Sequence, residues 1–233
     1  MIHQLIFAAP KPGMSEAEFQ RYWREVHAVR YASRIPQIRK YLIDSRIPYG
    51  REDGEPKWSG CAEIWLANDE EQLASLQTPE FLQGARLDEP NWAAFWRTVV
   101  LDTDAHELLA GPALTGNPGW VKLIRLVKRR EGLPLADFRE ASLTKHAELM
   151  LAVPGLRRYL QCHTRDGAYG IGEAVLDAAH QWWFDDVAAL TDALASPEFR
   201  RADEQLRSIV EPRYVHDLAF TEHWVIGPES RNS

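Results

Sequence analysis

The spacing of apolar positions along the first half of the chain alternates between strand-like and helix-like. Ser15 and Glu18 form an S-x-x-E capping box, and apolar residues then recur at steps of three and four from Phe19 onward. We therefore predict a helix that runs to about Arg34. Asn68 is predicted to open a second helix. Short apolar runs bounded by turn residues predict the strands. These runs are residues 3–9, 40–47, 60–67 and 98–109.

The same order of elements occurs a second time. Phe19 and His27 recur as Phe138 and His146, 119 residues later, and further matches keep this order to the end of the chain. Matches that keep their order over such a length indicate an internal repeat.

The two copies are separated by the segment 110–118, which is rich in Gly, Pro and small residues and is predicted to be a linker. The predicted domains are residues 1–112 and 118–233. In the second copy, the first strand is expected at residues 121–127 and the last at residues 214–226.

Each copy has the element order βαββαβ, which predicts an α+β protein of two fused ferredoxin-like repeats. Such a repeat places two helices on one face of a four-stranded antiparallel sheet and leaves the other face to be covered. We therefore expect the two sheets to pack face to face, so that one chain supplies both of the sheets that two subunits supply in a dimer.

Composition narrows the class of partner. The net charge of −7 argues against a nucleic-acid binder, and no apolar run reaches the length of a membrane span. The N-terminal residues lack the pattern of a signal peptide, and two cysteines cannot form a disulfide framework, so we expect a cytoplasmic protein. Nine tryptophans indicate thick apolar cores, a binding site for a flat apolar ligand, or both. The expected state is a monomer or a homodimer.

Residues 13–28 read GMSEAEFQRYWREVHA, and Pro36 is followed five residues later by Tyr41. This pattern resembles the signature of the EthD-like group in the dimeric α+β barrel superfamily. The resemblance implies a ligand cavity between sheet and helices. Superfamily members include cofactor-free cyclases, isomerases, decarboxylases and oxygenases that act on aromatic or polyketide-like molecules, and also heme proteins.

The second copy departs from the signature. Tyr22 and Trp23 are answered by Ala141 and Ser142, a change that removes roughly 200–300 Å² of ring surface. Two outcomes are open: a ligand-binding hollow beside His146, or repacking. Repacking would draw on Trp182, Trp183 and Phe184.

His27 and His146 are the candidate catalytic residues. Each lies on the apolar face of its predicted helix, where an imidazole serves either as a buried structural group or as a general acid or base held away from water. Other polar and aromatic residues are candidates for substrate binding. They are His3, Tyr22, Trp23, Tyr41, Glu63, Trp65, Lys122, Ser142, Tyr159, His163, His180 and Trp183.

No metal-ligating spacing such as H-E-x-x-H or C-x-x-C occurs, and no nucleotide-binding glycine motif occurs. We therefore expect neither a metal nor a cofactor, although a single axial histidine would suffice for a heme.

Together these observations predict a cofactor-independent enzyme on a small aromatic or polyketide-like substrate. Its reaction would be His-mediated proton transfer, in a decarboxylase, a cyclase or a related lyase or isomerase. The alternatives are a heme- or oxygen-dependent oxidoreductase, such as a monooxygenase or peroxidase, and a non-catalytic accessory protein that binds aromatic ligands.

Overall fold

The computed structural model describes residues 1–52, 54–114, 116, 118–170 and 172–231. They form two compact units. The first comprises Met1–Asp102, Leu114–Pro118 and Phe220–Ser233, and the second comprises Thr103–Ala113 and Gly119–Ala219. Positions 115 and 117 of the predicted linker lie outside the described residues.

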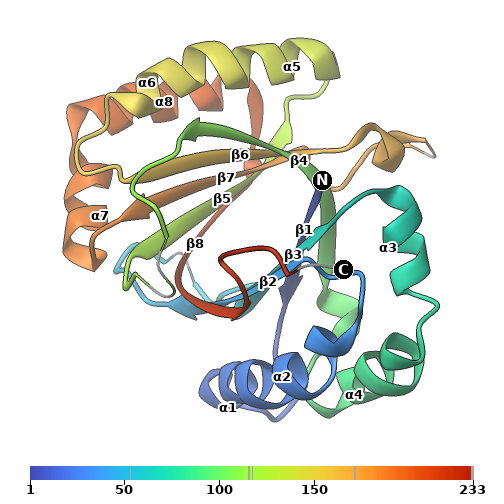
Figure 1. The fold of residues 1–233 in the computed structure, drawn as a ribbon. Helices are drawn as coiled ribbons and strands as arrows, with labels where there is room; N and C mark the ends of the chain where they lie inside the picture. The colour runs from blue at the N-terminus through green and yellow to red at the C-terminus, as the bar shows by residue number, and fades with distance from the viewer. Residues whose placement is uncertain (53, 115, 117, 171, 232–233) are drawn as a thin grey trace. The chain divides into compact units, whose positions relative to one another are not determined.

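The first unit has three central strands, in which β3 pairs antiparallel with both β1 and β2. Figure 1 shows helices α1, α2 and α4 on one side of this sheet. The elements are β1 (Ile2–Ala8), α1 (Glu16–Tyr22), η1 (Trp23–His27), α2 (Ala28–Arg30), η2 (Ala32–Arg34), β2 (Lys40–Ile47), β3 (Gly60–Leu66), α3 (Asp69–Ser75), η3 (Glu80–Ala85), α4 (Arg86–Asp88), η4 (Glu89–Asn91), η5 (Phe95–Arg97) and the start of β4 (Val99–Leu109).

The second unit repeats this arrangement, with β7 between β5 and β6, and with β4 from Thr103 onward paired to β6. Helices α5, α6 and α8 lie on one face of its sheet (Figure 1). The elements are β5 (Val121–Arg129), α5 (Leu135–Ala141), η6 (Ser142–His146), α6 (Ala147–Leu151), β6 (Arg158–Thr164), η7 (Asp166–Tyr169), β7 (Ala178–Phe184), α7 (Val187–Ala195), α8 (Pro197–Arg207) and the start of β8 (Val210–Ile226), whose residues from Phe220 onward belong to the first unit.

Local sequence signals explain several of these boundaries. The predicted capping box is present: the Glu18 amide donates to the Ser15 hydroxyl, and the Glu18 carboxylate accepts from the Ser15 amide. Asn68 caps α3 through its side chain, as predicted. The α+β class and the two ferredoxin-like repeats are confirmed. Among the described residues, no helix has both the length and the apolar character needed to cross a bilayer.

The first helix of each repeat contains a π-helical segment, η1 or η6, that ends on a histidine. A π turn holds one more residue than an α turn and is frequent at functional sites. His27 and His146 are both turned into the interior, where they are 7% and 0% exposed.

Large side chains from the strand side pack beside His146, which favours the repacking alternative over a ligand-binding hollow. Sheet register makes His180 and Trp182 the counterparts of Ala62 and Ile64 of the first unit. Trp182 is fully buried, and its ring lies near those of His146 and Phe199. The volume that the short side chain of Ser142 leaves free is thus taken up from the strand side.

This packing buries three histidines in the uncharged form. Burial lowers the pKa of His146 to about 3 and that of His163 to about 3, and it lowers the pKa of His180 well below 6.5. Since the unfolded chain binds protons more readily, this contribution to stability is complete above about pH 6.5 and is lost as the pH falls toward 3.

We therefore expect the free energy of unfolding to decrease between pH 7 and pH 4.5, above the range in which the paired carboxylates titrate. Urea unfolding at the two pH values measures the effect. His146→Leu, which removes one of these groups, should reduce the pH dependence. An unchanged dependence would contradict the assignment.

Trp182→Ala should destabilise the protein by about 3–5 kcal/mol, because it leaves a cavity in a close-packed interior. The matched control is Trp96→Ala, since the Trp96 side chain is 75% exposed; a change within about 0.5 kcal/mol is expected there. Equal losses for the two variants in denaturant titrations would refute this account of the core.

Candidate functional site

The first unit contains a cavity of about 390 Å³ between its sheet and its helices. Small side chains create the space: Ala8 and Ala62 line its floor, and sheet register places Val127 and His180 at the corresponding positions of the second unit. The cavity is lined mostly by apolar groups, which suits a small apolar ligand.

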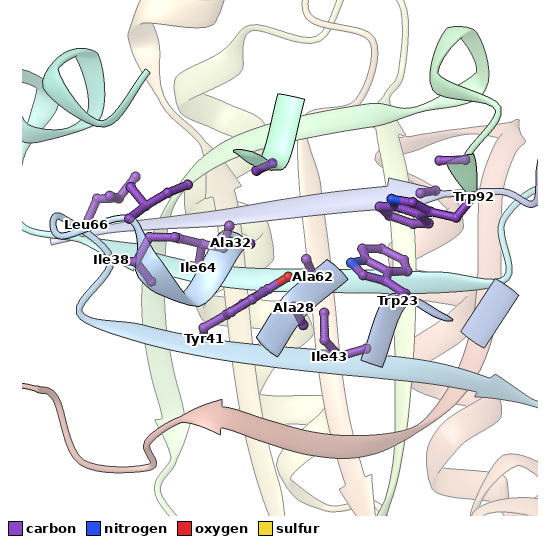
Figure 2. Close-up of a cluster of buried hydrophobic side chains, with 14 of the residues drawn as sticks. Trp23, Ala28, Ala32, Ile38, Tyr41, Ile43, Ala62, Ile64, Leu66 and Trp92 are labelled. Carbon is purple, nitrogen blue, oxygen red and sulfur yellow. The ribbon is translucent and has the colours of Figure 1, made fainter. Parts of the chain in front are cut away.

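Aromatic rings form one end of the cavity. Trp23 and Trp92 lie with ring centroids 4.8 Å apart, and Figure 2 shows them beside each other, with Ile38 and Leu66 toward the opposite end. In the same view the Tyr41 hydroxyl is directed toward the Trp23 indole nitrogen. Burial raises the pKa of Tyr41, and the Trp23 hydrogen bond opposes that shift only in part, so Tyr41 remains a phenol.

His27 lines the cavity and is paired with a carboxylate. Its Nδ1 lies 2.9 Å from Oδ2 of Asp88, a residue at the end of α4 that is 4% exposed. The other oxygen of Asp88, Oδ1, accepts hydrogen bonds from the Tyr22 hydroxyl at 2.8 Å and from the Asn91 amide at 3.0 Å.

These contacts fix the charge states of the pair. Burial by itself would raise the pKa of Asp88, but the hydrogen bonds from Asn91, His27 and Tyr22 outweigh it and hold that pKa below its usual value. Burial lowers the pKa of His27, although Asp88 opposes the shift. At neutral pH the site therefore holds an ionised carboxylate and a neutral imidazole.

The position of the imidazole proton follows from the same geometry. An ionised carboxylate only accepts, so the 2.9 Å contact places the proton on Nδ1 of His27. The Trp92 indole N–H is also directed at Nδ1, at 3.2 Å, but the ionised Asp88 oxygen is the closer partner and the stronger acceptor, so it determines where the imidazole proton lies. Nε2 of His27 is thus left with a lone pair and is available to a ligand as a base.

The second unit lacks this pair. The segment that holds Asp88 begins with a π-helical turn, η3, whereas its counterpart α8 is α-helical throughout, so Asp88 is answered by Gln205 or Leu206, neither of which is a carboxylate. His146 is fully buried, and the polar groups that act on its ring nitrogens are the Ala202 backbone and the Gln205 side chain, both outside strict hydrogen-bond geometry. Among the described residues no carboxylate is hydrogen-bonded to His146; the nearby Asp203 is paired with Arg125 instead.

Three of the residues singled out in the first copy line the cavity: Trp23, His27 and Tyr41. Tyr22 is not among the lining residues, and its hydroxyl donates to Asp88. The remaining three are brought together elsewhere. His3 bonds to Glu63 and stacks on Trp65, and strand alternation places all three on the face of the sheet opposite the cavity. Glu63 also lies with Asp44 and Glu222, whose carboxylate oxygens are within 4.8 Å of one another.

Four residues singled out in the second copy form a buried polar cluster around Gln161. Gln161 accepts from Ser142 at 2.8 Å and from His163 at 2.9 Å, and donates to the Tyr159 hydroxyl. His180 lies 3.5 Å from the Ser142 hydroxyl. The other two, Lys122 and Trp183, contact each other through a cation–π interaction, with the ammonium 5.2 Å from the ring centroid.

Sequence reasoning missed Asp88, Asn91 and Trp92. They lie in a run of short helical turns, η3 to η4, where no single period tells which side chains face inward. The available signal was that the first copy has a carboxylate, Asp88, where the second has Gln205 and Leu206.

Comparisons with known proteins agree with this architecture. Structures similar over the full length include a protein provisionally named a monooxygenase from Lactobacillus acidophilus NCFM, at 12% identity over 99% of both chains with a TM-score of 0.54. Another, with the same provisional name, is from Fusobacterium nucleatum, at 7% identity over 100% of this chain and 96% of that one, with a TM-score of 0.63.

A third, named an anthrone oxidase-like protein, has 11% identity over 100% of this chain and 96% of that one, with a TM-score of 0.66. At such identities the likeness establishes the fold alone. No curated protein matches the chain.

The EthD domain family model matches the chain twice, over residues 11–95 and 130–206, once in each repeat. These two segments make up more than half of the chain. The protein therefore belongs to the EthD domain family.

Proposed function

We propose that the first unit carries an oxidoreductase site that uses dioxygen to oxidise a flat, largely apolar small molecule with an acidic C–H group. The observation that carries this proposal is the His27–Asp88 pair at the wall of an apolar cavity of about 390 Å³. A base held beside a hydrophobic binding space can ionise such a molecule once bulk water has been excluded.

The expectation of a decarboxylase, cyclase or related lyase or isomerase is wrong. Full-length structural neighbours are provisionally named monooxygenases, or are named after an anthrone oxidase, and these names favour the alternative reading of an oxygen-dependent oxidoreductase. The physical reason for the error is that removal of a proton by a histidine begins both kinds of reaction. The residues that hold the histidine in place do not show whether the deprotonated substrate then passes its electrons to dioxygen.

The proposed reaction begins when Nε2 of His27 accepts a proton from the substrate. Asp88 stabilises the imidazolium that forms, as a buried carboxylate does in other acid–base pairs. For a methylene activated by a neighbouring aromatic ketone, the balanced reaction is R₂CH₂ + O₂ → R₂C=O + H₂O. The substrate supplies all four electrons, one oxygen atom becomes the new carbonyl, and the other leaves as water with the two methylene hydrogens.

The lining does not suit a heme. A heme carries two propionates, and Arg86 is the only lysine or arginine among the described residues that line the cavity. Arg86 is already paired with Glu89, and Asp102 adds a second carboxylate to the lining. No step of the proposal is therefore routed through a heme.

His27→Gln and Asp88→Asn should each lower the rate of oxygen uptake with anthrone by about 10²-fold or more, because the base is removed or its tautomer is no longer fixed. An oxygen electrode with product analysis for anthraquinone measures the effect. His146→Leu, the equivalent position in the second unit, should retain the rate per folded molecule. Wild-type rates in both His27→Gln and Asp88→Asn would contradict the proposal, as would wild-type protein that binds anthrone without consuming oxygen.

Ala62→Phe should abolish ligand binding while the protein stays folded, because the new ring occupies the floor of the cavity. We expect anthrone, titrated without oxygen and followed by tryptophan fluorescence, to bind at least about tenfold more weakly than to wild type. Ala62→Ser, which adds one oxygen atom, is the matched control and should change affinity little. Undiminished affinity in Ala62→Phe would place the ligand elsewhere.

A further inference from the structure

We infer that the cavity of the first unit selects its ligand by charge, accepting neutral and cationic flat molecules and rejecting anions. This inference rests on the proposed site and deepens it, since it concerns the class of substrate. It follows from the placement of three carboxylates and one guanidinium around the cavity.

The two acidic groups of the lining outweigh its single cation. The Glu89 side chain is 9% exposed, whereas that of its partner Arg86 is 53% exposed. Solvent and salt screen an exposed charge much more strongly than a buried one, so the carboxylate dominates the field inside the cavity. Asp102, which accepts a hydrogen bond from Gln4 at 2.8 Å, adds a second negative charge to the lining.

A third carboxylate, that of Asp88, lies next to the His27 imidazole and adds to the negative charge near the cavity. Asp88 is ionised, and its hydrogen-bond partners His27, Tyr22 and Asn91 are all uncharged at neutral pH. In the described part of the chain, no lysine or arginine bonds to it. The end of the cavity that holds the base is therefore also negative until a proton is transferred.

The aromatic walls favour the same sign of ligand. The faces of aromatic rings attract cations, and one wall already does so: the Arg86 guanidinium lies 5.2 Å from the ring centroid of Phe95, which lines the cavity. Trp23, Trp92 and Phe81 present further rings to the interior. A ligand ammonium group would thus find both ring faces and carboxylates.

The charge balance of the proposed reaction agrees with this selectivity. Proton transfer creates one substrate anion opposite one imidazolium, so the site as a whole gains no charge. A ligand that carried a carboxylate from the start would add a negative charge, and the only cation in the described lining, Arg86, is already paired with Glu89. The favoured substrates are therefore neutral aromatic ketones and phenols or their amine-bearing relatives, and not aromatic carboxylic acids.

Three probes of nearly identical shape test the inference: 2-naphthylmethylamine, 2-naphthalenemethanol and 2-naphthoate, which are cationic, neutral and anionic at pH 7.5. Isothermal titration of the wild-type chain should show that 2-naphthylmethylamine and 2-naphthalenemethanol each bind at least about tenfold more tightly than 2-naphthoate. Because this comparison uses only wild-type protein, it does not depend on whether any variant folds. Equal or tighter binding of 2-naphthoate would overturn the inference.

Variants then assign the effect to particular groups. Glu89→Gln combined with Asp102→Asn should reduce the difference in affinity between 2-naphthalenemethanol and 2-naphthoate, and Arg86→Met should increase it. An unchanged difference in affinity in both variants would overturn the role of these residues. Oxygen uptake separates the two proposals: the charge order without anthrone oxidation would refute the function alone, and anthrone oxidation without the charge order would refute the selectivity alone.

Discussion

The site depends on the hydrogen bond between Nδ1 of His27 and the carboxylate of Asp88. It determines which nitrogen carries the proton, leaves the other free toward the cavity, and places a buried negative charge where an imidazolium would form. Such a charge is costly to bury unless it is hydrogen-bonded. Tyr22 and Asn91 provide those bonds, and because burial and the Asp88 contact raise the pKa of Tyr22 to about 12, its hydroxyl remains a donor at neutral pH.

The two repeats show how one architecture gives either a cavity or a solid core. In the first, a large ring on the helix, Trp23, packs on Gly60 of the sheet, and the small Ala62 follows two residues along the same strand. In the second, small Ser142 on the helix faces the bulky His180, with Trp182 beside it. Ring volume has moved from helix to sheet, and close packing is preserved in the second unit because the exchange is complementary. The hollow in the first unit remains because its floor also carries Ala8.

Much of the fold could be predicted because it follows from sequence patterns of short or constant spacing. The Ser15–Glu18 capping box, the strand periodicity and the internal repeat each involve neighbouring positions or a constant spacing, and the inward position of His27 follows from helical steps. The cavity and the partner of His27 could not be predicted in this way. The first depends on paired sizes across a helix and a sheet, and the second on Asp88, which lies 61 residues away in a run of short helical turns.

Fusion of the repeats in one chain explains how their sites diverged. In a dimer of identical subunits every substitution acts twice, so a change that opens a cavity or buries a carboxylate must be tolerated in both copies. Here the position that holds Asp88 in one repeat holds no carboxylate in the other, where Gln205 and Leu206 occupy that turn of α8. The second unit can therefore fill the space between helix and sheet with Trp182 and His180, while the first keeps a hollow that lowers its stability.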